Sequence, residues 1–370
     1  MTDTTGFWVG FSKVSGVGPA RLRALLDYYG DISSAWQANL GELRAIGLDK
    51  RTVENLAKTR AEIDLGAELK KIEQLKVTVL TWDSPDYPAL LKAIPDPPPT
   101  LYVRGQLTDQ DAWAVAVVGT RRATTYGKEC TRLISHGLAK NGITVVSGLA
   151  YGIDTEAHRT AVEAGGRTIA VLGSGVDVIY PADNRKLAGA IIEQGAIVSE
   201  YPLGTRPDSK NFPPRNRIIS GLSLGTLVVE GTIRSGARIT TDYALEQGRD
   251  VLAIPGPILR KSSEGPNHLI QHGAKLVTQV DDILEELNLT MIAHQTEARA
   301  IIPDNDIEAT LLQQLSSDPI HVDVLGQSTG LSASDLSSTL TMMELKGMVR
   351  QVGGMNYIIA RETMGSYAVD

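Results

Sequence analysis

The stretch "VAVVGTRRATTYG", residues 115–127, carries the pattern that decides the fold. It begins with a short apolar run rich in valine, which is typical of a buried strand. Gly119 and Thr120 then mark a turn, and Thr124 or Thr125 can cap a helix that follows. A strand, a tight turn and a helix start in direct succession form the first half of a βαβ unit.

Five further apolar runs follow at helix-length intervals, namely "TVVSG" (144–148), "TIAVLG" (168–173), "AIVSE" (196–200), "TLVVEG" (226–231) and "VLAIPG" (251–256). Buried strands separated by helices indicate a parallel sheet covered on both faces. With right-handed crossovers, this predicts an α/β fold with a Rossmann-like, doubly wound parallel sheet. Ligands of such sheets bind beyond the carboxyl ends of the strands, so the residues that follow each run are the candidate site.

The 370 residues suggest more than one domain, and we expect three, at 1–65, 66–290 and 302–370. In the first, "VSGVGPARLRALLDYYG" (14–30) resembles a helix-hairpin-helix module, whose glycine-rich turn brings backbone amides close to phosphate. The alternative is an ordinary turn in a helical scaffold. Because of the glycine-rich turn, we predict a helix-hairpin-helix-like helical domain before the sheet.

The last domain has the layout of a winged helix. A helix over about 305–316 and a second short helix precede a third, which Ser332 can cap and which ends near Lys346. Two strands then flank Gly353 and Gly354. The third helix has Lys346 as its one cation, against Asp335 and Glu344. DNA phosphates need Lys or Arg, so this composition favours a structural or protein-binding role.

Composition excludes several classes of protein. The chain is 42% hydrophobic with a net charge of −7, so a nucleic-acid site must be a local basic patch. A single cysteine, Cys130, rules out a disulfide framework and a cysteine-rich zinc site. The N-terminus lacks the pattern of a signal peptide, and no apolar run approaches the roughly 20 residues of a membrane span. We expect a soluble, cytoplasmic protein without membrane partners.

The loops after the strands contain candidate anion-binding groups. After the first run these are Gly119, Thr120, Arg121 and Arg122. The first loop lacks the G-x-G-x-x-G pattern of dinucleotide-binding proteins. The next run ends in Ser147 and Gly148, whereas a dinucleotide site would have an acidic residue there to bind the ribose. Gly236 opens a predicted helix, whose free amides suit a phosphate. These features favour phosphate binding over binding of a nicotinamide cofactor.

The segment "FPPRNRIISGLS", residues 212–223, is the densest functional signal. Lys210 lies two residues before this segment. Together they provide the candidate site residues Lys210, Phe212, Arg215, Asn216 and Arg217. Cations for the phosphates and an aromatic ring for a base are the minimal requirements for holding single-stranded nucleic acid. The alternative is an internal ion pair with Glu200 or Glu230. Arg217 is the better candidate for a structural role, and Arg215 for a ligand contact.

A metal or catalytic site has little support. Asp154 and His158 lie four apart on a predicted helix, but two residues do not make a metal site. The alternative, which we favour, is Asp154 as an N-cap and His158 as a packed, hydrogen-bonded side chain. No Ser-His-Asp set or acid and base pair emerges in the middle of the chain. We expect no cofactor, no metal and no enzymatic activity.

The order of these motifs resembles the DNA-processing protein A family, DprA or Smf, over roughly residues 70–285. The resemblance implies single-stranded DNA binding without catalysis, protection of incoming strands during natural transformation, and loading of the RecA recombinase, often by a homodimer. The family's glycine-serine-arginine motif corresponds to Gly119, Thr120 and Arg121, with threonine in place of serine. Its basic and aromatic pocket corresponds to 210–217, and its self-association region to "GPNHLIQHGA" (265–274).

Two alternatives belong to other classes. A nucleotide-cleaving enzyme of the phosphoribohydrolase type has a similar sheet, but the comparable stretch here, "VVEGTIRSGA" (228–237), lacks the P-G-G of that signature. A winged-helix transcription regulator is disfavoured by the weakly basic third helix.

Overall fold

The structure, a computed structural model, describes residues 4–289, 305–316, 319–345 and 348–359. The chain forms two compact units, Met1–Thr290 and Met291–Asp370, which are considered separately. A division of the first unit near residue 65, into a helical domain and a sheet domain, stays a prediction.

A nine-stranded sheet, in the order β1-β2-β6-β5-β4-β3-β7-β8-β9, is the centre of the first unit. The strands are β1 (Val77–Thr81), β2 (Thr100–Gly105), β3 (Ala114–Val118), β4 (Thr144–Ser147), β5 (Thr168–Val171), β6 (Ala196–Ser199), β7 (Gly225–Val228), β8 (Asp250–Ala253) and β9 (Lys275–Leu276). Strands β3 to β9 pair in parallel. The predicted doubly wound fold is confirmed, and the six predicted runs are β3 to β8.

Two features of the sheet were not predicted. Strand β2 pairs antiparallel with β6, and β1 pairs antiparallel with β2, so a hairpin extends one edge of the parallel sheet. Strand β9 adds a short parallel strand at the other edge. Polar residues such as Thr78 and Arg104 interrupt the two hairpin strands, and β9 has only two residues, so none of them shows the unbroken apolar run of the central strands.

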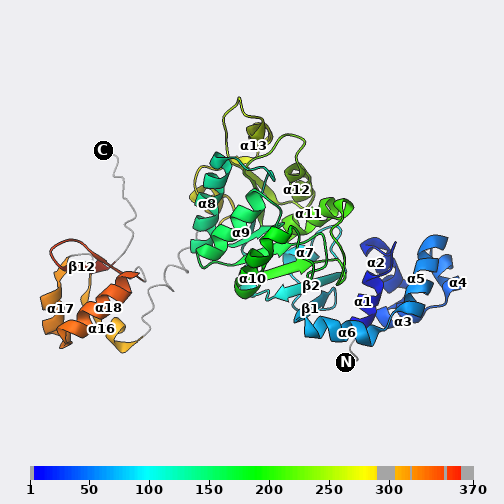
Figure 1. Cartoon of the computed structure of the whole chain (residues 1–370), viewed down its shortest axis with the longest axis horizontal. Coiled ribbons are helices and arrows are strands. Elements are labelled where there is room, and N and C mark those ends of the chain that lie inside the picture. Colours follow the sequence, from blue (N-terminus) through cyan, green and yellow to red (C-terminus); the bar gives the residue numbers. More distant parts are fainter. Residues whose placement is uncertain (1–3, 290–304, 317–318, 346–347, 360–370) are drawn as a thin grey trace. The chain divides into compact units, whose positions relative to one another are not determined.

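Helices cover both faces of the sheet (Figure 1). The main ones are α7 (Ala89–Lys92), α8 (Thr125–Lys140), α9 (Ile153–Glu163), α10 (Arg185–Gln194), α11 (Phe212–Gly221), α12 (Gly236–Glu246), α13 (Glu264–Gln271) and α14 (Asp281–Glu286). Side chains alternate along each strand: Ile169 and Val171 pack with Ile218 of α11, whereas Ala170 packs with Ile191 of α10. This alternation follows from the two-residue period of a strand.

Six helices precede the sheet: α1 (Thr5–Ser12), α2 (Pro19–Tyr29), α3 (Ile32–Gln37), α4 (Leu40–Ala45), α5 (Lys50–Glu62) and α6 (Leu65–Gln74). They have their own core, which includes Trp8, Leu25 and Leu56. The Ser12 hydroxyl lies 2.8 Å from that of Tyr102 on β2, so α1 contacts the sheet. The glycine turn between α1 and α2 is present, but its likeness to a helix-hairpin-helix module stays a prediction.

The second unit has the predicted winged-helix layout. It comprises α16 (Asp306–Gln314), β10 (Ile320–His321), α17 (Val322–Thr329), α18 (Ala333–Leu345), β11 (Val349–Gln351) and β12 (Asn356–Ile359). The Ser332 hydroxyl accepts the amide of Asp335 at 3.2 Å, as a cap of α18 should. Lys346 and Gly347, where this helix was expected to end, lie outside the described residues. Strand β10, which joins the hairpin through β12, was not predicted.

Within the described ranges, no helix has the length and apolar character needed to cross a membrane.

Candidate nucleic-acid interface

The direction of winding changes at β3. The chain proceeds from β3 to β4, β5 and β6 on one side, and β7 returns to the other side of β3. Loops after β3 and β7 diverge at such a switch point and leave a crevice at the carboxyl ends. A cavity of about 750 Å³ lies there. Its lining includes Gly119, Thr120, Arg121, Arg122, Asp154, Tyr180, Phe212, Arg215, Asn216, Ser235 and Gly236.

Glu230, at the end of β7, fixes the loop that carries Arg121 and Arg122. Its carbonyl accepts the amide of Thr120 at 2.8 Å, and its carboxylate accepts the amide and the hydroxyl of Thr124 at 2.9 and 2.6 Å. The Ser262 hydroxyl donates to the same carboxylate at 3.2 Å. Thr124 also caps α8 by accepting the amide of Gly127, so the predicted cap is confirmed.

Gly119 is required by close approach. A Cβ atom there would lie 2.5 Å from a side-chain carbon of Ile153 and 2.9 Å from the Glu230 carbonyl oxygen. The next residues, Arg121 and Arg122, are exposed. The backbone is therefore held tightly against the sheet while the two cationic side chains extend into solvent at the cavity.

Arg215 forms part of the cavity floor and is 4% exposed. Its Nη1 atom donates to the Gly148 carbonyl at 2.8 Å and also to the Val171 carbonyl. Its Nε atom has no hydrogen-bond partner among the described residues. Burial lowers the pKa of Arg215 to about 10, so the guanidinium still carries its charge at neutral pH.

Asp154 accompanies this buried cation. It accepts the amides of Gly148 at 3.2 Å and Ala150 at 3.3 Å. Burial raises the pKa of the Asp154 carboxyl, and the positive charge of Arg215 opposes that shift. The prediction that Asp154 is an N-cap was wrong, because Gly152, with φ of 81°, occupies that position and Asp154 lies inside the helix. A glycine can adopt this backbone conformation without the penalty of a side chain.

His158 is fully buried beside this region. Its Nδ1 atom lies 2.7 Å from the Thr168 hydroxyl, so the expected packed, hydrogen-bonded histidine is confirmed. Burial lowers its pKa to about 3, which keeps the ring neutral. No cluster of three or more metal-ligating side chains occurs in the part of the chain that the structure describes.

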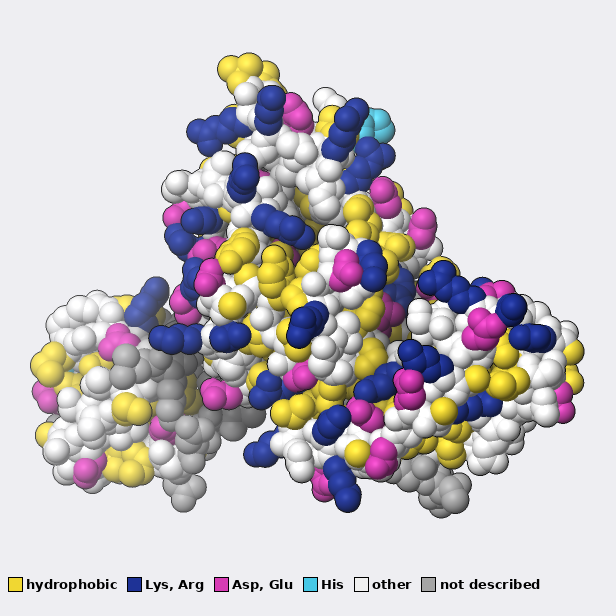
Figure 2. All heavy atoms as spheres, turned by 45° about the vertical axis from the view of Figure 1, so that its right-hand side comes forward, with side chains coloured by type: hydrophobic (Ala, Val, Ile, Leu, Met, Phe, Trp, Pro, Cys, Tyr) yellow, Lys and Arg dark blue, Asp and Glu magenta, His cyan; other side chains and the backbone are white. Residues whose placement is uncertain are grey.

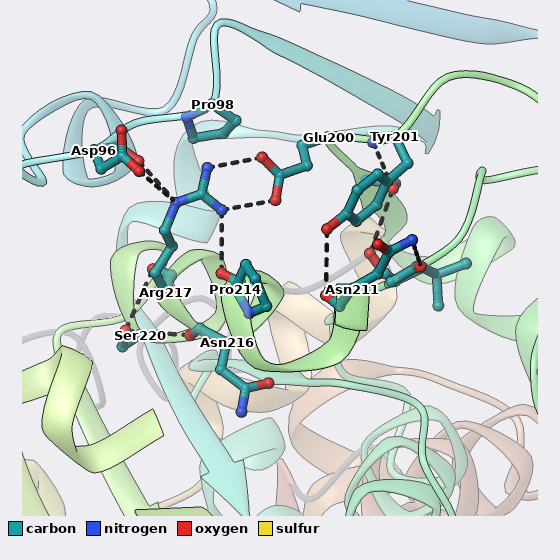
Figure 3. A network of polar contacts seen from close by, with 12 residues as sticks. Asp96, Pro98, Glu200, Tyr201, Asn211, Pro214, Asn216, Arg217 and Ser220 are labelled. Atoms are coloured by element: carbon teal, nitrogen blue, oxygen red, sulfur yellow. Dashed lines mark hydrogen bonds and ion pairs between the residues drawn. The ribbon is translucent and has the colours of Figure 1, made fainter. Parts of the chain in front are cut away.

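Arg217 is not among the residues that line the cavity, and it belongs to the polar network shown in Figure 3. Its two terminal nitrogens donate to the two carboxylate oxygens of Glu200, each at 2.7 Å, and its Nε donates to the Asp96 carbonyl at 2.9 Å. The ion pair with Glu200, suggested as an alternative from the sequence, is confirmed. Pro214, whose carbonyl accepts from Arg217 at 3.1 Å, ties this network to the first turn of α11. Arg217 lines a different, smaller pocket.

Of the other predicted site residues, two line the cavity and three do not. Asn216 reaches from α11 to the Gly236 carbonyl at 3.4 Å, so it joins two walls of the cavity. Gly236 opens α12 behind Ser235, whose side chain accepts no capping hydrogen bond. Ser147 is buried, donates to the Val117 carbonyl at 2.7 Å, and lies outside the lining with Gly148. Lys210 is exposed beside Asp208, also outside the lining.

Phe212 lies between charged and aromatic neighbours. The guanidinium carbons of Arg121 and Arg215 are 5.6 and 6.0 Å from its ring centroid. The ring of Tyr180 is 5.9 Å away and tilted by 33°. Sequence reasoning missed Tyr180, which follows β5 by nine residues. Its position beyond the carboxyl end of a central strand, in "VIYP", was the available signal.

Residues 78–288 match the family of DNA recombination-mediator protein A, and residues 295–355 match the DprA winged-helix domain. The chain belongs to the DprA family. The resemblance seen in the sequence is confirmed, and the family is one of DNA processing and recombination.

Similarity extends over nearly the whole chain. Protein Smf of Synechocystis sp. is 37% identical and aligns with 95% of this chain and 98% of its own length. Protein Smf of Escherichia coli is 39% identical, over 90% of this chain and 93% of its own. The DNA processing protein A structure from Streptococcus pneumoniae superimposes with a TM-score of 0.68 at 40% identity, covering 76% of this chain and 97% of that one.

A second solved structure is that of DNA processing protein A from Helicobacter pylori, which is described for its single-stranded DNA binding mode. It gives a TM-score of 0.52 at 29% identity and covers 58% of this chain and 97% of that one.

Proposed function

We propose that this chain is a non-enzymatic recombination mediator that binds single-stranded DNA in the cavity between β3 and β7. The observation that carries the proposal is that three arginines line one cavity at the switch point of the sheet. Arg121 and Arg122 are exposed, and Arg215 is buried. Membership in the DprA family and the single-stranded DNA binding described for the Helicobacter pylori relative support it.

The cavity suits a phosphate backbone for physical reasons. Arg121 and Arg122 are exposed, so their charges are accessible to phosphates, whereas the buried Arg215 adds a fixed charge at the cavity lining. Helices α11 and α12 both begin at the cavity, where the positive ends of their dipoles attract anions. The chain as a whole carries a charge of −7, and on the face in Figure 2 cationic side chains are interspersed with acidic ones. Attraction of DNA therefore depends on this local cluster.

Two finer roles rest on the family resemblance. The first is protection of incoming DNA during natural transformation and loading of RecA onto it. The second is self-association as a homodimer through residues 265–274, which include most of α13. Beside this segment, Ile258 and Leu259 are 86% and 95% exposed, which is unusual for large apolar side chains and consistent with a protein contact.

The test is the affinity of the full chain for a fluorescent single-stranded oligonucleotide and for the matched duplex, at two salt concentrations. We expect Arg121→Ala to weaken single-strand binding about 10- to 100-fold, as removal of a charged hydrogen bond would. The slope of log affinity against log salt should become shallower by about 0.7, because one phosphate is no longer neutralised by the protein. Lys140→Ala, at the opposite end of α8, is the matched control and should bind like the parent.

Equal affinity of Arg121→Ala and the parent would refute the assignment of the cavity. Preference for duplex over single strand would refute the ligand. RecA loading is tested separately, by the rate at which RecA assembles on a strand already bound by this protein, and an unchanged rate would remove that role alone.

A further inference from the structure

We propose that Tyr180 is the platform on which a base of the bound strand stacks, an inference that rests on the proposed function. Aromatic rings that stack bases hold single strands without sequence preference, because every base has a flat π-face. The sequence pointed to Phe212 for this role. The surroundings of the two rings favour Tyr180.

Phe212 is already in use inside the protein. Arg121 and Arg215 lie over its ring, and the ring of Tyr180 lies beside it. Gly173 contacts it so closely that a Cβ there would lie 2.9 Å from the phenyl ring. The phenyl group lines the cavity but is only partly exposed, and these neighbours give it a role in positioning its partners.

Tyr180 is placed differently. It lines the same cavity, yet it is 47% exposed, which is high for a large aromatic side chain. Its hydroxyl has no hydrogen-bond partner among the residues that the structure describes. Phe212 supports the tyrosine ring from one side, so the ring has a backing and an open surface, as a stacking platform needs.

The cation and the platform share one neighbour. The guanidinium of Arg121 and the ring of Tyr180 lie 5.6 and 5.9 Å from the centroid of the Phe212 ring, so a charge for the phosphate and a ring for the base lie around the same side chain. A strand whose phosphate contacts Arg121 can therefore place a base on Tyr180. Phosphate binding alone explains the arginines and leaves the exposed ring without a role.

A second exposed tyrosine, Tyr151, directly follows the cavity-lining residue Ala150. Tyr151, in the loop after β4, is 46% exposed, and its hydroxyl donates to Asp183 at 2.8 Å. Asp183 is three residues from Tyr180, so this bond holds the two loops together. The next base along the strand has Tyr151 within the same group of loops, and the tether keeps that ring in a defined position.

The experiment measures dissociation constants of the full chain for a short oligothymidine and for a matched strand with abasic sites. Tyr180→Ala should weaken binding of oligothymidine by about 5- to 150-fold, the range for removal of one stacked base. Tyr180→Phe should keep the parent affinity, since the ring remains. On the abasic strand, Tyr180→Ala and the parent should bind alike.

Two controls separate stacking from folding. Trp113→Ala changes another exposed aromatic residue, just before β3 and so at the end of that strand opposite the cavity, and should leave both affinities unchanged. Photocrosslinking of the unaltered protein to a strand with 5-iodouracil should yield an adduct at Tyr180. The crosslink decides the matter if Tyr180→Ala fails to fold, and an adduct at Phe212 instead would overturn the proposal.

The outcomes also distinguish this inference from the proposed function. If Tyr180→Ala binds oligothymidine like the parent while Arg121→Ala does not, the platform is refuted and the DNA-binding cavity stands. An equal loss on both strands would likewise refute stacking, because the effect would not depend on bases. If the parent protein itself does not bind single strands, the proposed function fails, and the inference fails with it.

Discussion

At the scale of single residues, Arg215 and Arg217 of α11 have different roles although they are close in sequence. Both are almost fully buried, at 4% and 5% exposure. They lie two positions apart, about 200° around a helix of 3.6 residues per turn, and so point to opposite sides. Arg215 donates to backbone carbonyls at the cavity floor, whereas Arg217 is bound by Glu200. The sequence already favoured Arg217 for the structural role, and its ion pair with Glu200 agrees with that assignment, whereas a ligand contact of Arg215 stays a prediction.

The Arg217–Glu200 pair gives a prediction about stability. Arg217→Met leaves the Glu200 carboxylate, also largely buried, without its cation, and we expect the free energy of unfolding to fall by about 3–5 kcal/mol. The double change with Glu200→Met should recover much of that loss, because no charge is then left unpaired. Urea unfolding followed by circular dichroism measures both.

The salt dependence of DNA binding can show whether Arg217 contacts DNA instead. If Arg217→Met unfolds like the parent and instead lowers the salt slope for single strands, the arginine contacts DNA and the structural assignment is wrong.

At the scale of elements, the strand–turn–helix junction from β3 to α8 depends on Gly119. Gly119→Ala would place a methyl group against Ile153 and the Glu230 carbonyl. The backbone must then move, and the loop with Arg121 and Arg122 moves with it. We expect lower stability, by about 1–3 kcal/mol as for overpacking, and weaker binding of single strands.

The matched control is Gly189→Ala in α10, where a Cβ has no neighbour within 4 Å. It should raise the free energy of unfolding by about 0.5–1 kcal/mol, because alanine favours an exposed helix interior over glycine. DNA affinity should be unchanged in this variant. Thermal unfolding and anisotropy titration of the two variants make the comparison, and a Gly119→Ala protein with parental values would contradict the tight contact.

The elements that could be predicted from sequence are those with a strong local signal. Strands β3 to β8 are apolar because both of their faces are buried, and Thr124 and Ser332 have the chemistry of caps. The two-residue strands β9 and β10 have too few residues for a period to show. Asp154 was misplaced in its helix because an acid suits the first turn as well as the cap, and only the backbone angles of Gly152 decide between them.

The site was predictable where it follows strand ends and unpredictable where it depends on packing. The loop at 119–122 and Gly236 are brought to one cavity, as parallel strands require. Gly148 is excluded because the Arg215 side chain lies against it, and Ser147 is excluded because it is buried and bonded to the Val117 carbonyl. Tyr180 was missed because tyrosine before proline is common in loops, and exposure of a ring is a property of the folded chain.

At the scale of the whole molecule, the second unit has few cationic residues for binding DNA. Residues 305–359 have the cations Lys346 and Arg350, against Asp306, Glu308, Asp318, Asp323, Asp335 and Glu344. Since phosphate binding requires cations, we expect a chain ending at residue 289 to bind single strands within about twofold of the full chain, with the same salt slope. A large loss on truncation, measured by anisotropy, would assign DNA contacts to the winged helix.

The switch point at β3 also sets the moment at which the protein becomes able to act. One wall of the cavity comes from residues 119–122, which follow β3, and another from residues 235–240, which follow β7; these two strands are paired in the sheet but lie far apart in the order of synthesis. A nascent chain has no complete cavity until β7 and the start of α12 have left the ribosome and paired with β3. Fragments that end before α12, whether from stalled synthesis or from proteolysis, therefore lack a complete cavity. They should not compete with the full chain for single-stranded DNA.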